Sequence, residues 1–438
     1  MGFAKVTCTL PGQRSEALLK KWAQYEADKT GFQAPVAIHH GRGAMLYDED
    51  GNAFLDWTSG VLVCNLGHCH PVLVKAVQEA GARMMNVYEY CTEYRVDAAE
   101  ALVKHAPKHL DSCFILSTGS EATDAAVRIM KRYTGNFETI SFYGGFHGRT
   151  LSTASIGGLK KIKKGMGPMI PGSLRAPFPY CYRCPFRARP ESCGRMCLEF
   201  LDDMVQANSV GSLAGLIVEP YLGTAGFIFP PEGYMPALEK WCREHEIPFT
   251  LDEIQASYGR TGTLWACEHE GLTPDIVTLG KGLGSGITVS ALLMRREVID
   301  RALGKGELGS TYGGNPVSCA AISAVLEVMD AEDILGNVAR VGRIYAERLP
   351  GLLALSERVG DVRGKGLVWG IEIVADRQSK EPAPELVRKL IVLCAQNGLL
   401  IGSVGFYGNV VRVAPPLVCT EAQAHESIDI MSKCVQML

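Results

Sequence analysis

Short, continuous runs of apolar and β-branched residues recur along the middle of the chain, and segments with helical patterns separate them. The runs are Cys113 to Leu116, Thr139 to Phe142, Gly215 to Val218, Pro248 to Leu251, Ile276 to Leu279 and Val289 to Met294. Strands without polar alternation are buried on both faces, which is typical of a mostly parallel sheet covered by helices. The pattern therefore predicts an α/β fold for the middle of the chain.

The two ends of the chain follow a different pattern. Residues 13–35 predict an N-terminal helix with a polar lead-in, and two strand-like runs within 44–57 flank an Asp-Gly-Asn turn, which predicts a β-hairpin. After residue 331 the helices and strands segregate as in an α+β domain. We therefore expect an N-terminal segment that contributes to a small lobe (1–71), a large domain (72–330) and a C-terminal small domain (331–438).

Composition narrows the class of protein. The 438 residues are 47% hydrophobic and 21% charged, so the chain can bury a large core, and its formal net charge of −3 gives no general attraction to nucleic acid or anionic membranes. The N-terminus lacks the apolar region of a signal peptide, and no stretch has the length of a membrane helix. Fifteen scattered cysteines suit reduced thiols. We expect a cytoplasmic protein that acts on small molecules.

One lysine lies inside a glycine-rich turn directly after the run Ile276 to Leu279. The turn reads Gly280-Lys281-Gly282-Leu283-Gly284, and its small residues leave room for the lysine amine to approach a planar cofactor. A lysine amine condenses with aldehydes, and burial lowers the pKa of such an amine so that more of it is nucleophilic. The turn predicts a Schiff-base site at Lys281, although a surface lysine in a loop would give the same local pattern.

Two further segments end apolar runs with groups that suit a cofactor. Gly119 and Ser120 follow the run that ends at Leu116 and open a helix, whose N-terminus favours a phosphate; a plain helix cap is the alternative. Asp252 ends the run Pro248 to Leu251, where a buried carboxylate requires a cation such as a protonated pyridine nitrogen; a turn-capping acid is the alternative. Asp252, like Lys281, is expected at the carboxyl edge of the sheet, where open α/β folds bind ligands.

Together these groups indicate a pyridoxal-phosphate enzyme. The sequence resembles the class III aminotransferases of fold type I, which include 4-aminobutyrate and ornithine aminotransferases and dialkylglycine decarboxylase. The resemblance covers nearly the whole chain through motifs at residues 67–71, 144–150, 252–255 and 411–417.

The resemblance implies pyridoxal 5'-phosphate as the cofactor and gives each residue a role. Lys281 would form the Schiff base and move the proton, and Asp252 would hold the pyridinium nitrogen. The other cofactor-binding residues would be Gln255 at the ring hydroxyl, Phe146 stacked on the ring, and Gly119, Ser120 and Thr311 at the phosphate. In this family Thr311 comes from the neighbouring subunit, so the resemblance implies a homodimer, with a higher oligomer left open.

Three residues are expected to contact the substrate. Arg412 matches the family's arginine for a substrate carboxylate, and Arg149 matches a second arginine that meets the far carboxylate of an ω-amino acid. Val61 aligns with an apolar pocket wall. The family's ω-amino-acid members have a glutamate that neutralises the arginine at the position of Arg412 when the substrate needs no α-carboxylate contact. Thr224 stands here instead of that glutamate, so Arg412 should stay available to an acidic group.

These residues predict an aminotransferase that moves an amino group from an amino acid or ω-amino acid, such as 4-aminobutyrate, to a 2-oxo acid such as 2-oxoglutarate. Decarboxylation-dependent transamination or racemisation is the alternative on the same scaffold, because the bond that breaks depends on substrate orientation. A ligand-sensing regulator is the non-enzymatic alternative, but residues 1–40 lack a basic DNA-binding segment.

Four cysteines are clustered in a loop rich in proline and arginine: Cys181, Cys184, Cys193 and Cys197. Thiols at this spacing can hold zinc or an iron–sulfur cluster, or they can remain free in a packed loop. We assign no residue as a metal ligand.

Overall fold

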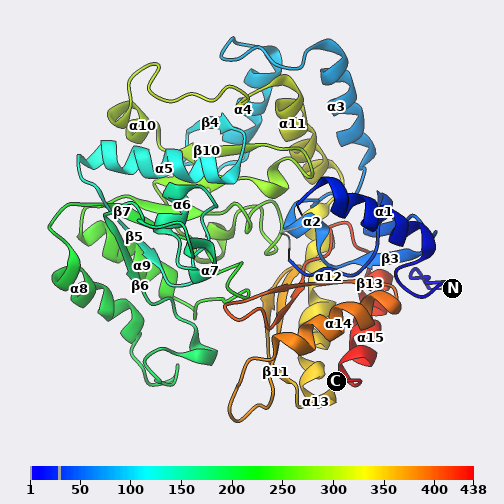
Figure 1. Cartoon of the computed structure of the whole chain (residues 1–438). Coiled ribbons are helices and arrows are strands. Elements are labelled where there is room, and N and C mark those ends of the chain that lie inside the picture. The colour runs from blue at the N-terminus through cyan, green and yellow to red at the C-terminus, as the bar shows by residue number, and fades with distance from the viewer. Residues whose placement is uncertain (1, 28–30) are drawn as a thin grey trace. The chain divides into compact units, whose positions relative to one another are not determined.

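The computed structural model describes residues 2–27 and 31–438, which form two compact units (Figure 1). The larger unit comprises Val72–Tyr258 and Thr263–Ala331, and the smaller unit combines the described part of Met1–Pro71 with Gly259–Gly262 and Glu332–Leu438. No helix in the described ranges is both long enough and apolar enough to cross a membrane.

A seven-stranded sheet forms the centre of the larger unit, with the strand order β4-β10-β9-β8-β7-β5-β6. The strands are β4 (Ser112–Leu116), β5 (Glu138–Phe142), β6 (Ser173–Ala176), β7 (Leu213–Val218), β8 (Phe249–Asp252), β9 (Ile276–Leu279) and β10 (Ser290–Met294). All neighbours from β9 to β6 pair in parallel, whereas β10 is antiparallel to both β4 and β9. The predicted α/β fold with a mostly parallel sheet is confirmed, and the six predicted runs are all strands.

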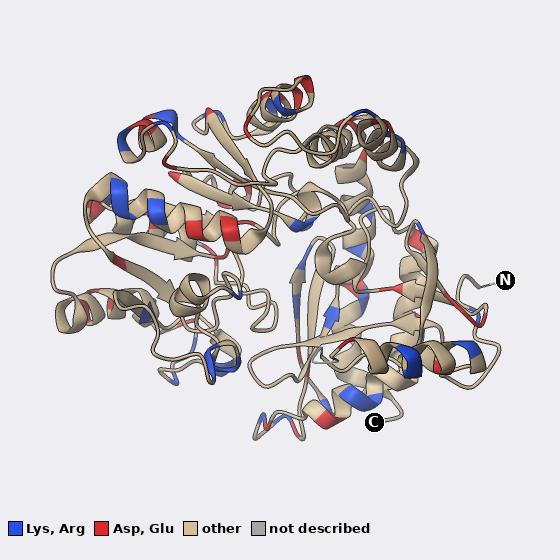
Figure 2. Cartoon of the chain, turned by 45° about the horizontal axis from the view of Figure 1, so that its top comes forward, with Lys and Arg blue, Asp and Glu red and all other residues tan. Residues whose placement is uncertain are grey.

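Helices surround this sheet in the alternation that the sequence predicts. They are α3 (Pro71–Arg83), α4 (Glu93–His105), α5 (Gly119–Thr134), α6 (Leu151–Ile156), α7 (Lys160–Lys163), α8 (Met196–Asn208), α9 (Tyr234–Glu244), α10 (Arg296–Ala302) and α11 (Pro316–Ala331). Helix α5 buries Ala122, Ala126 and Met130 against a core that includes Ile217 and Leu292 of the sheet. Figure 2 shows its charge distribution, with acids near its start and bases near its end, which complements the helix dipole.

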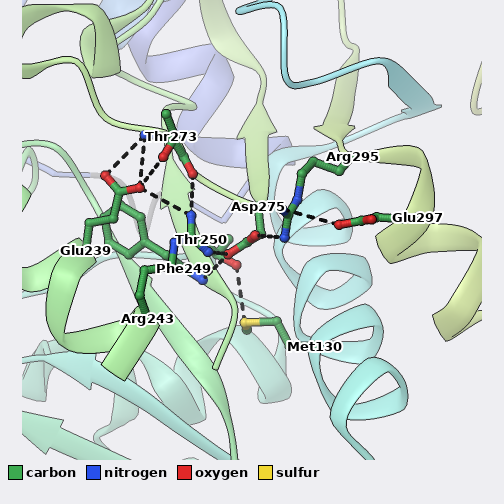
Figure 3. A network of polar contacts seen from close by, with 9 residues as sticks. All are labelled: Met130, Glu239, Arg243, Phe249, Thr250, Thr273, Asp275, Arg295 and Glu297. Carbon is green, nitrogen blue, oxygen red and sulfur yellow. Dashed lines mark hydrogen bonds and ion pairs between the residues drawn. The ribbon is translucent and has the colours of Figure 1, made fainter. Parts of the chain in front are cut away.

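A buried acid fixes the start of β9, at the opposite end from Lys281. Asp275 accepts a hydrogen bond from the Phe249 backbone N–H at 2.8 Å and forms ion pairs with Arg243, at 2.6 Å, and with Arg295 (Figure 3). Because Phe249 begins β8, this network holds the starts of the two strands that carry Asp252 and Lys281. The alignment of these strands is therefore fixed from their far ends.

The smaller unit has two four-stranded sheets, ordered β1-β2-β3-β13 and β11-β12-β15-β14. Its strands are β1 (Ile38–Arg42), β2 (Met45–Asp48), β3 (Ala53–Asp56), β11 (Val359–Lys365), β12 (Val368–Ile373), β13 (Leu399–Leu400), β14 (Gly402–Val404) and β15 (Val410–Val413). Its helices are α1 (Gln13–Tyr25), α2 (Ser59–Leu62), α12 (Ile334–Arg348), α13 (Leu352–Leu355), α14 (Pro384–Gln396) and α15 (Glu421–Val435). The antiparallel pairing of β2 with β3 confirms the predicted hairpin.

Helix α2 is not an ordinary helix, because four consecutive residues have left-handed backbone angles. The φ values are 42° at Ser59, 62° at Gly60, 68° at Val61 and 61° at Leu62. A β-branched residue such as Val61 is a true outlier in this region, and such strain is concentrated at functional sites. The segment that carries the predicted pocket-wall residue is therefore strained.

Candidate active site

Asp252 and Lys281 lie at the carboxyl ends of adjacent parallel strands. Asp252 pairs with Thr278 in the register of β8 and β9, and Lys281 begins a short 3₁₀ turn two residues after β9 ends. The φ angle of Lys281 is +45°, so the chain turns sharply there. A cavity of about 250 Å³ opens at this edge. It is lined by Thr118, Gly119, Ser120, Phe146, His147, Gly148, Arg149, Glu219, Thr224, Asp252, Ile254, Gln255 and Lys281.

The carboxylate of Asp252 is buried and held in one orientation. One oxygen, Oδ1, accepts hydrogen bonds from the Thr278 hydroxyl at 3.0 Å and from the Ile254 N–H at 3.2 Å. The other, Oδ2, lies 2.7 Å from Nδ1 of His147. Burial alone would lower the pKa of His147, but the hydrogen bond and charge of Asp252, with the charge of Glu219, raise it. His147 therefore orients the buried Asp252 carboxylate from the side of Oδ2.

Glu219 joins two loops that line the cavity. Its Oε1 accepts a hydrogen bond from the Phe146 N–H at 2.8 Å, and its Oε2 accepts one from the Gly223 N–H at 3.0 Å. Burial and the charge of Asp252 raise the pKa of Glu219 to about 7, against the opposing charge of His147. The carboxyl group therefore holds the loop of Phe146 and the loop of Thr224 at fixed positions along the cavity.

The start of α5 forms one end of the cavity. Thr118 caps the helix by accepting a hydrogen bond from the Glu121 N–H at 3.3 Å, and the Ser120 hydroxyl accepts one from the Arg149 N–H at 3.2 Å. Gly148 has a φ of +140°, and a Cβ added there would overlap the Ser120 and Thr153 hydroxyls. This end has the backbone N–H groups and the space that a phosphate requires.

The middle of the cavity offers groups for a ring with polar substituents. Gln255 presents a buried Oε1 that has no hydrogen-bond partner within residues 2–27 and 31–438. The guanidinium carbon of Arg149 lies 5.9 Å from the centre of the Phe146 ring. A buried acceptor without a partner indicates that a ligand supplies the donor. A hydroxyl on a pyridine ring can be this donor, so the lining residues fit a phosphorylated pyridine ring that bears a hydroxyl.

Seven predicted site residues line this cavity: Gly119, Ser120, Phe146, Arg149, Asp252, Gln255 and Lys281. Thr311 belongs to the same unit but is exposed and is not part of the cavity lining. Arg412 and Val61 belong to the smaller unit. There Arg412 is 5% exposed and Val61 is 45% exposed.

Comparisons with known proteins agree with this geometry. The family model described as aminotransferase class-III matches residues 27–435. This chain belongs to the class III aminotransferase family. The 4-aminobutyrate aminotransferase of Mycobacterium tuberculosis strain H37Rv is 34% identical over 98% of this chain and 97% of that relative. An alanine/serine racemase of Pyrococcus horikoshii is 32% identical over 100% of this chain and 93% of that relative.

Among solved structures, an amine transaminase from an uncultivated Pseudomonas species in its PLP-bound form superposes with a TM-score of 0.86. It is 27% identical and covers 94% of this chain and 98% of its own. The predicted fold type and enzyme class of this aminotransferase are therefore confirmed.

Two titratable residues of the cavity, His147 and Glu219, have no role that follows from the sequence alone. His147 lies within the motif 144–150, and Glu219 directly follows the apolar run Gly215 to Val218. Their roles depend on the distances to Asp252, Phe146 and Gly223, which bring together segments far apart in the sequence. A histidine or acid near a motif carries no signal of such a partner by itself.

The four clustered cysteines surround a separate cavity of about 220 Å³ in the larger unit. In the described ranges, no group of three or more histidine, cysteine or acidic side chains is placed to hold a metal ion. Burial raises the pKa of Cys181, and it raises the pKa of Cys197 to about 11. Both pKa shifts describe the loop with its thiols protonated, and the two alternatives for this loop stay as the sequence left them.

Proposed function

We propose that this aminotransferase moves the amino group of an ω-amino acid such as 4-aminobutyrate to a 2-oxo acid, with 2-oxoglutarate as the acceptor. The observation that carries the proposal is the position of Arg149, which lines the same cavity as Lys281. A guanidinium binds a carboxylate with two parallel hydrogen bonds. A substrate with an acidic group at the end opposite its amine can therefore place that group at Arg149 and its amine near Lys281.

Pyridoxal 5'-phosphate is the cofactor of this enzyme. When bound, it supplies an aldehyde that condenses with amines and a ring that accepts electrons. In our proposal the α5 N-terminus at Gly119 and Ser120 binds the phosphate, Phe146 stacks on the ring and Gln255 bonds its hydroxyl. Asp252, held by His147, keeps the proton on the ring nitrogen.

Lys281 has two tasks in this proposal. Its amine holds the cofactor, and after release it takes a proton from one substrate carbon and returns it to the neighbouring atom of the cofactor. Glu219 maintains the spacing between Phe146 and the loop of Thr224, so that the substrate keeps a fixed position relative to the cofactor ring. Arg412 anchors the carboxylate of the second substrate.

The test is a screen of amino donors against 2-oxoglutarate and pyruvate, with Lys281→Ala and Arg149→Gln as variants. Lys281→Ala should abolish turnover and the cofactor's Schiff-base absorbance, whereas Arg149→Gln should raise KM for 4-aminobutyrate more than for an amine without a carboxylate. Turnover by Lys281→Ala would contradict the assignment of the lysine. An equal effect of Arg149→Gln on both donors would contradict the ω-amino-acid assignment.

Racemisation is the second candidate, because a relative similar over the whole chain is named an alanine/serine racemase. The same assays decide it when enantiomer composition and CO2 release are followed without a 2-oxo acid. Interconversion of alanine enantiomers faster than amino transfer would favour the racemase. CO2 release that does not need Arg149 would favour decarboxylation.

We also propose a homodimer in which Thr311 completes the phosphate site of the partner subunit. The support is an exposed apolar surface next to Thr311, formed by Met85 (69% exposed), Tyr88 (53%), Tyr90 (78%) and Tyr312 (67%). The Asn86 side chain donates a hydrogen bond to the Thr311 carbonyl at 3.0 Å, which ties the two segments together. Exposed aromatic patches of this kind are typical of interfaces.

Subunit mixing tests this arrangement directly. Hybrid dimers of Lys281→Ala and Thr311→Ala subunits should regain activity, because one of their two sites then has both native residues. If Thr311 acts within its own subunit, each hybrid site carries one lesion and no activity returns.

We further propose a cytoplasmic location, which is supported by the free thiols of all fifteen cysteines.

A further inference from the structure

Arg412 is a buried cation with which no acidic side chain of residues 2–27 and 31–438 forms an ion pair. It lies on β15 in the smaller unit, 5% exposed, and its Nε has no hydrogen-bond partner in the described part of the chain. Burial lowers the pKa of Arg412 to about 10, and only the nearby charge of Asp56 opposes this change. A Cβ at Gly402, which faces Arg412 in the β14–β15 register, would overlap Nη2 of the guanidinium. The fold therefore keeps space around a cation that is costly to leave unpaired.

Asp56 is close to Arg412 but is already occupied by other donors. Backbone bonds bring the two segments together, since Ala414 donates to the Trp57 carbonyl at 2.9 Å and accepts from the Ser59 hydroxyl at 2.8 Å. Asp56 nevertheless forms no ion pair with Arg412 in the described ranges. Its oxygens instead accept hydrogen bonds from the following residues and from a histidine.

Among the described residues, every side-chain or backbone group that donates to the Asp56 carboxylate belongs to the turn that follows it or to His68. The backbone N–H and the hydroxyl of Thr58 bond Oδ1 at 2.6 and 2.8 Å, and the Ser59 N–H bonds Oδ2 at 3.0 Å. Nε2 of His68 lies 2.8 Å from Oδ2. Of these groups only His68 can carry a positive charge, so it alone can neutralise the buried carboxylate.

His68 is held in its charged form at neutral pH. Burial by itself would lower the pKa of His68, but the hydrogen bond and charge of Asp56, and its contact with the Cys64 thiol, raise that pKa to about 10. The titratable groups that act on His68 are Asp56, at the end of β3, and Cys64, and the charge of Asp56 also acts on Arg412 of β15. A neutral group at position 68 would leave Asp56 without its ionic partner, and its charge would still act on Arg412.

We infer that His68 is a specificity-determining residue: by neutralising Asp56 it leaves Arg412 free to bind the carboxylate of the substrate. The ligand class is a 2-oxo acid, the second substrate of the proposed reaction, bound through its carboxylate. The inference rests on the proposed role of Arg412 as the carboxylate anchor. It adds the reason that Arg412 does not form an ion pair with Asp56. His68 acts through Asp56 and touches neither the cofactor nor the substrate in this scheme.

The test compares binding and turnover in the holoenzyme of His68→Phe and His68→Gln. Calorimetry with pyruvate, a 2-oxo acid that has no far carboxylate for Arg149, should show a dissociation constant raised at least about tenfold in His68→Phe and less in His68→Gln, which keeps a donor to Asp56. KM for 2-oxoglutarate should rise similarly while kcat changes less, because a lost anchor removes binding common to ground and transition states. KM for 4-aminobutyrate, whose carboxylate is assigned to Arg149, should not rise.

Two further variants separate the possible failures. Cys64→Ser keeps the imidazolium and should bind pyruvate like the wild type, and Arg412→Gln should weaken pyruvate binding. If Arg412→Gln has no effect, the proposed carboxylate anchor is wrong; if it weakens binding but neither His68 variant does, only the role of His68 is wrong. Should His68→Phe not fold, as judged by circular dichroism and cofactor absorbance, His68→Gln decides the question: unchanged pyruvate affinity would overturn the inference.

Discussion

The replacement Asp275→Asn should destabilise the larger unit without touching the active site. The Asp275 side chain is 2% exposed and compensates two guanidinium groups, those of Arg243 (40% exposed) and Arg295 (36%). Removing one partner of a fully buried ion pair costs about 3–5 kcal/mol. Because both guanidinium groups stay partly hydrated and an asparagine oxygen can still accept the hydrogen bond from Phe249, we expect a loss of about 2–3 kcal/mol.

A matched control removes a charge from the edge of the same network. Glu297 lies 3.3 Å from Arg295 but is 67% exposed, so Glu297→Gln should cost at most about 0.5 kcal/mol. Urea unfolding of the holoenzymes at equal protein concentration, followed by fluorescence, measures both variants. Equal midpoints for the two variants would refute the reasoning that burial, not the number of ion pairs, makes Asp275 important. Turnover well below the unfolding midpoint should stay close to that of the wild type, because Asp275 lies at the far ends of β8 and β9.

Three other predictions concern the two units separately. Gly402→Ala should push the Arg412 guanidinium aside and raise KM for carboxylate substrates, while the cofactor stays bound. The control Gly351→Ala should leave KM unchanged, because a Cβ at Gly351 meets no atom within 4 Å. Gly148→Ala should weaken cofactor retention, measured by absorbance after dialysis, because its Cβ would overlap the Ser120 hydroxyl; full retention would show that this end of the cavity adapts. Since the pKa of Glu219 is raised from 4.5 to about 7, its contribution to stability falls as pH rises between these values, and Glu219→Gln should flatten the pH dependence of the urea midpoint over that range.

The sequence predicted those parts of the fold that depend on local pattern. The apolar runs located six strands of the main sheet. Lys281, in the glycine-rich turn, and Asp252, at the end of its strand, were both predicted as site residues, and both line one cavity. These signals are local because buried parallel strands have a distinctive composition and because their carboxyl ends meet at one edge. Strand β6, with an arginine among its four residues, had no such signal.

Long-range partners could not be predicted in the same way. The antiparallel direction of β10 depends on its pairing with β4 and β9, and its apolar run is consistent with either direction. The short segment Gly259–Gly262 belongs to the smaller unit because the buried Arg260 donates hydrogen bonds to the carbonyls of Leu367 and Pro415, at 3.0 and 2.6 Å. No periodicity in the sequence marks an arginine that bonds residues more than a hundred positions away.

The pairing of β4 with β10 has a consequence for synthesis on the ribosome. In the sheet order, β4 has β10 as its neighbour, so residues 112–116 acquire their strand partner only after residues 290–294 have been made. Helix α5, which begins directly after β4, is therefore expected to be anchored late, after most of the larger unit has emerged. A nascent chain truncated before β10 would already contain Lys281 yet lack the support of its phosphate-binding helix, so cofactor capture should be one of the last events in its biogenesis.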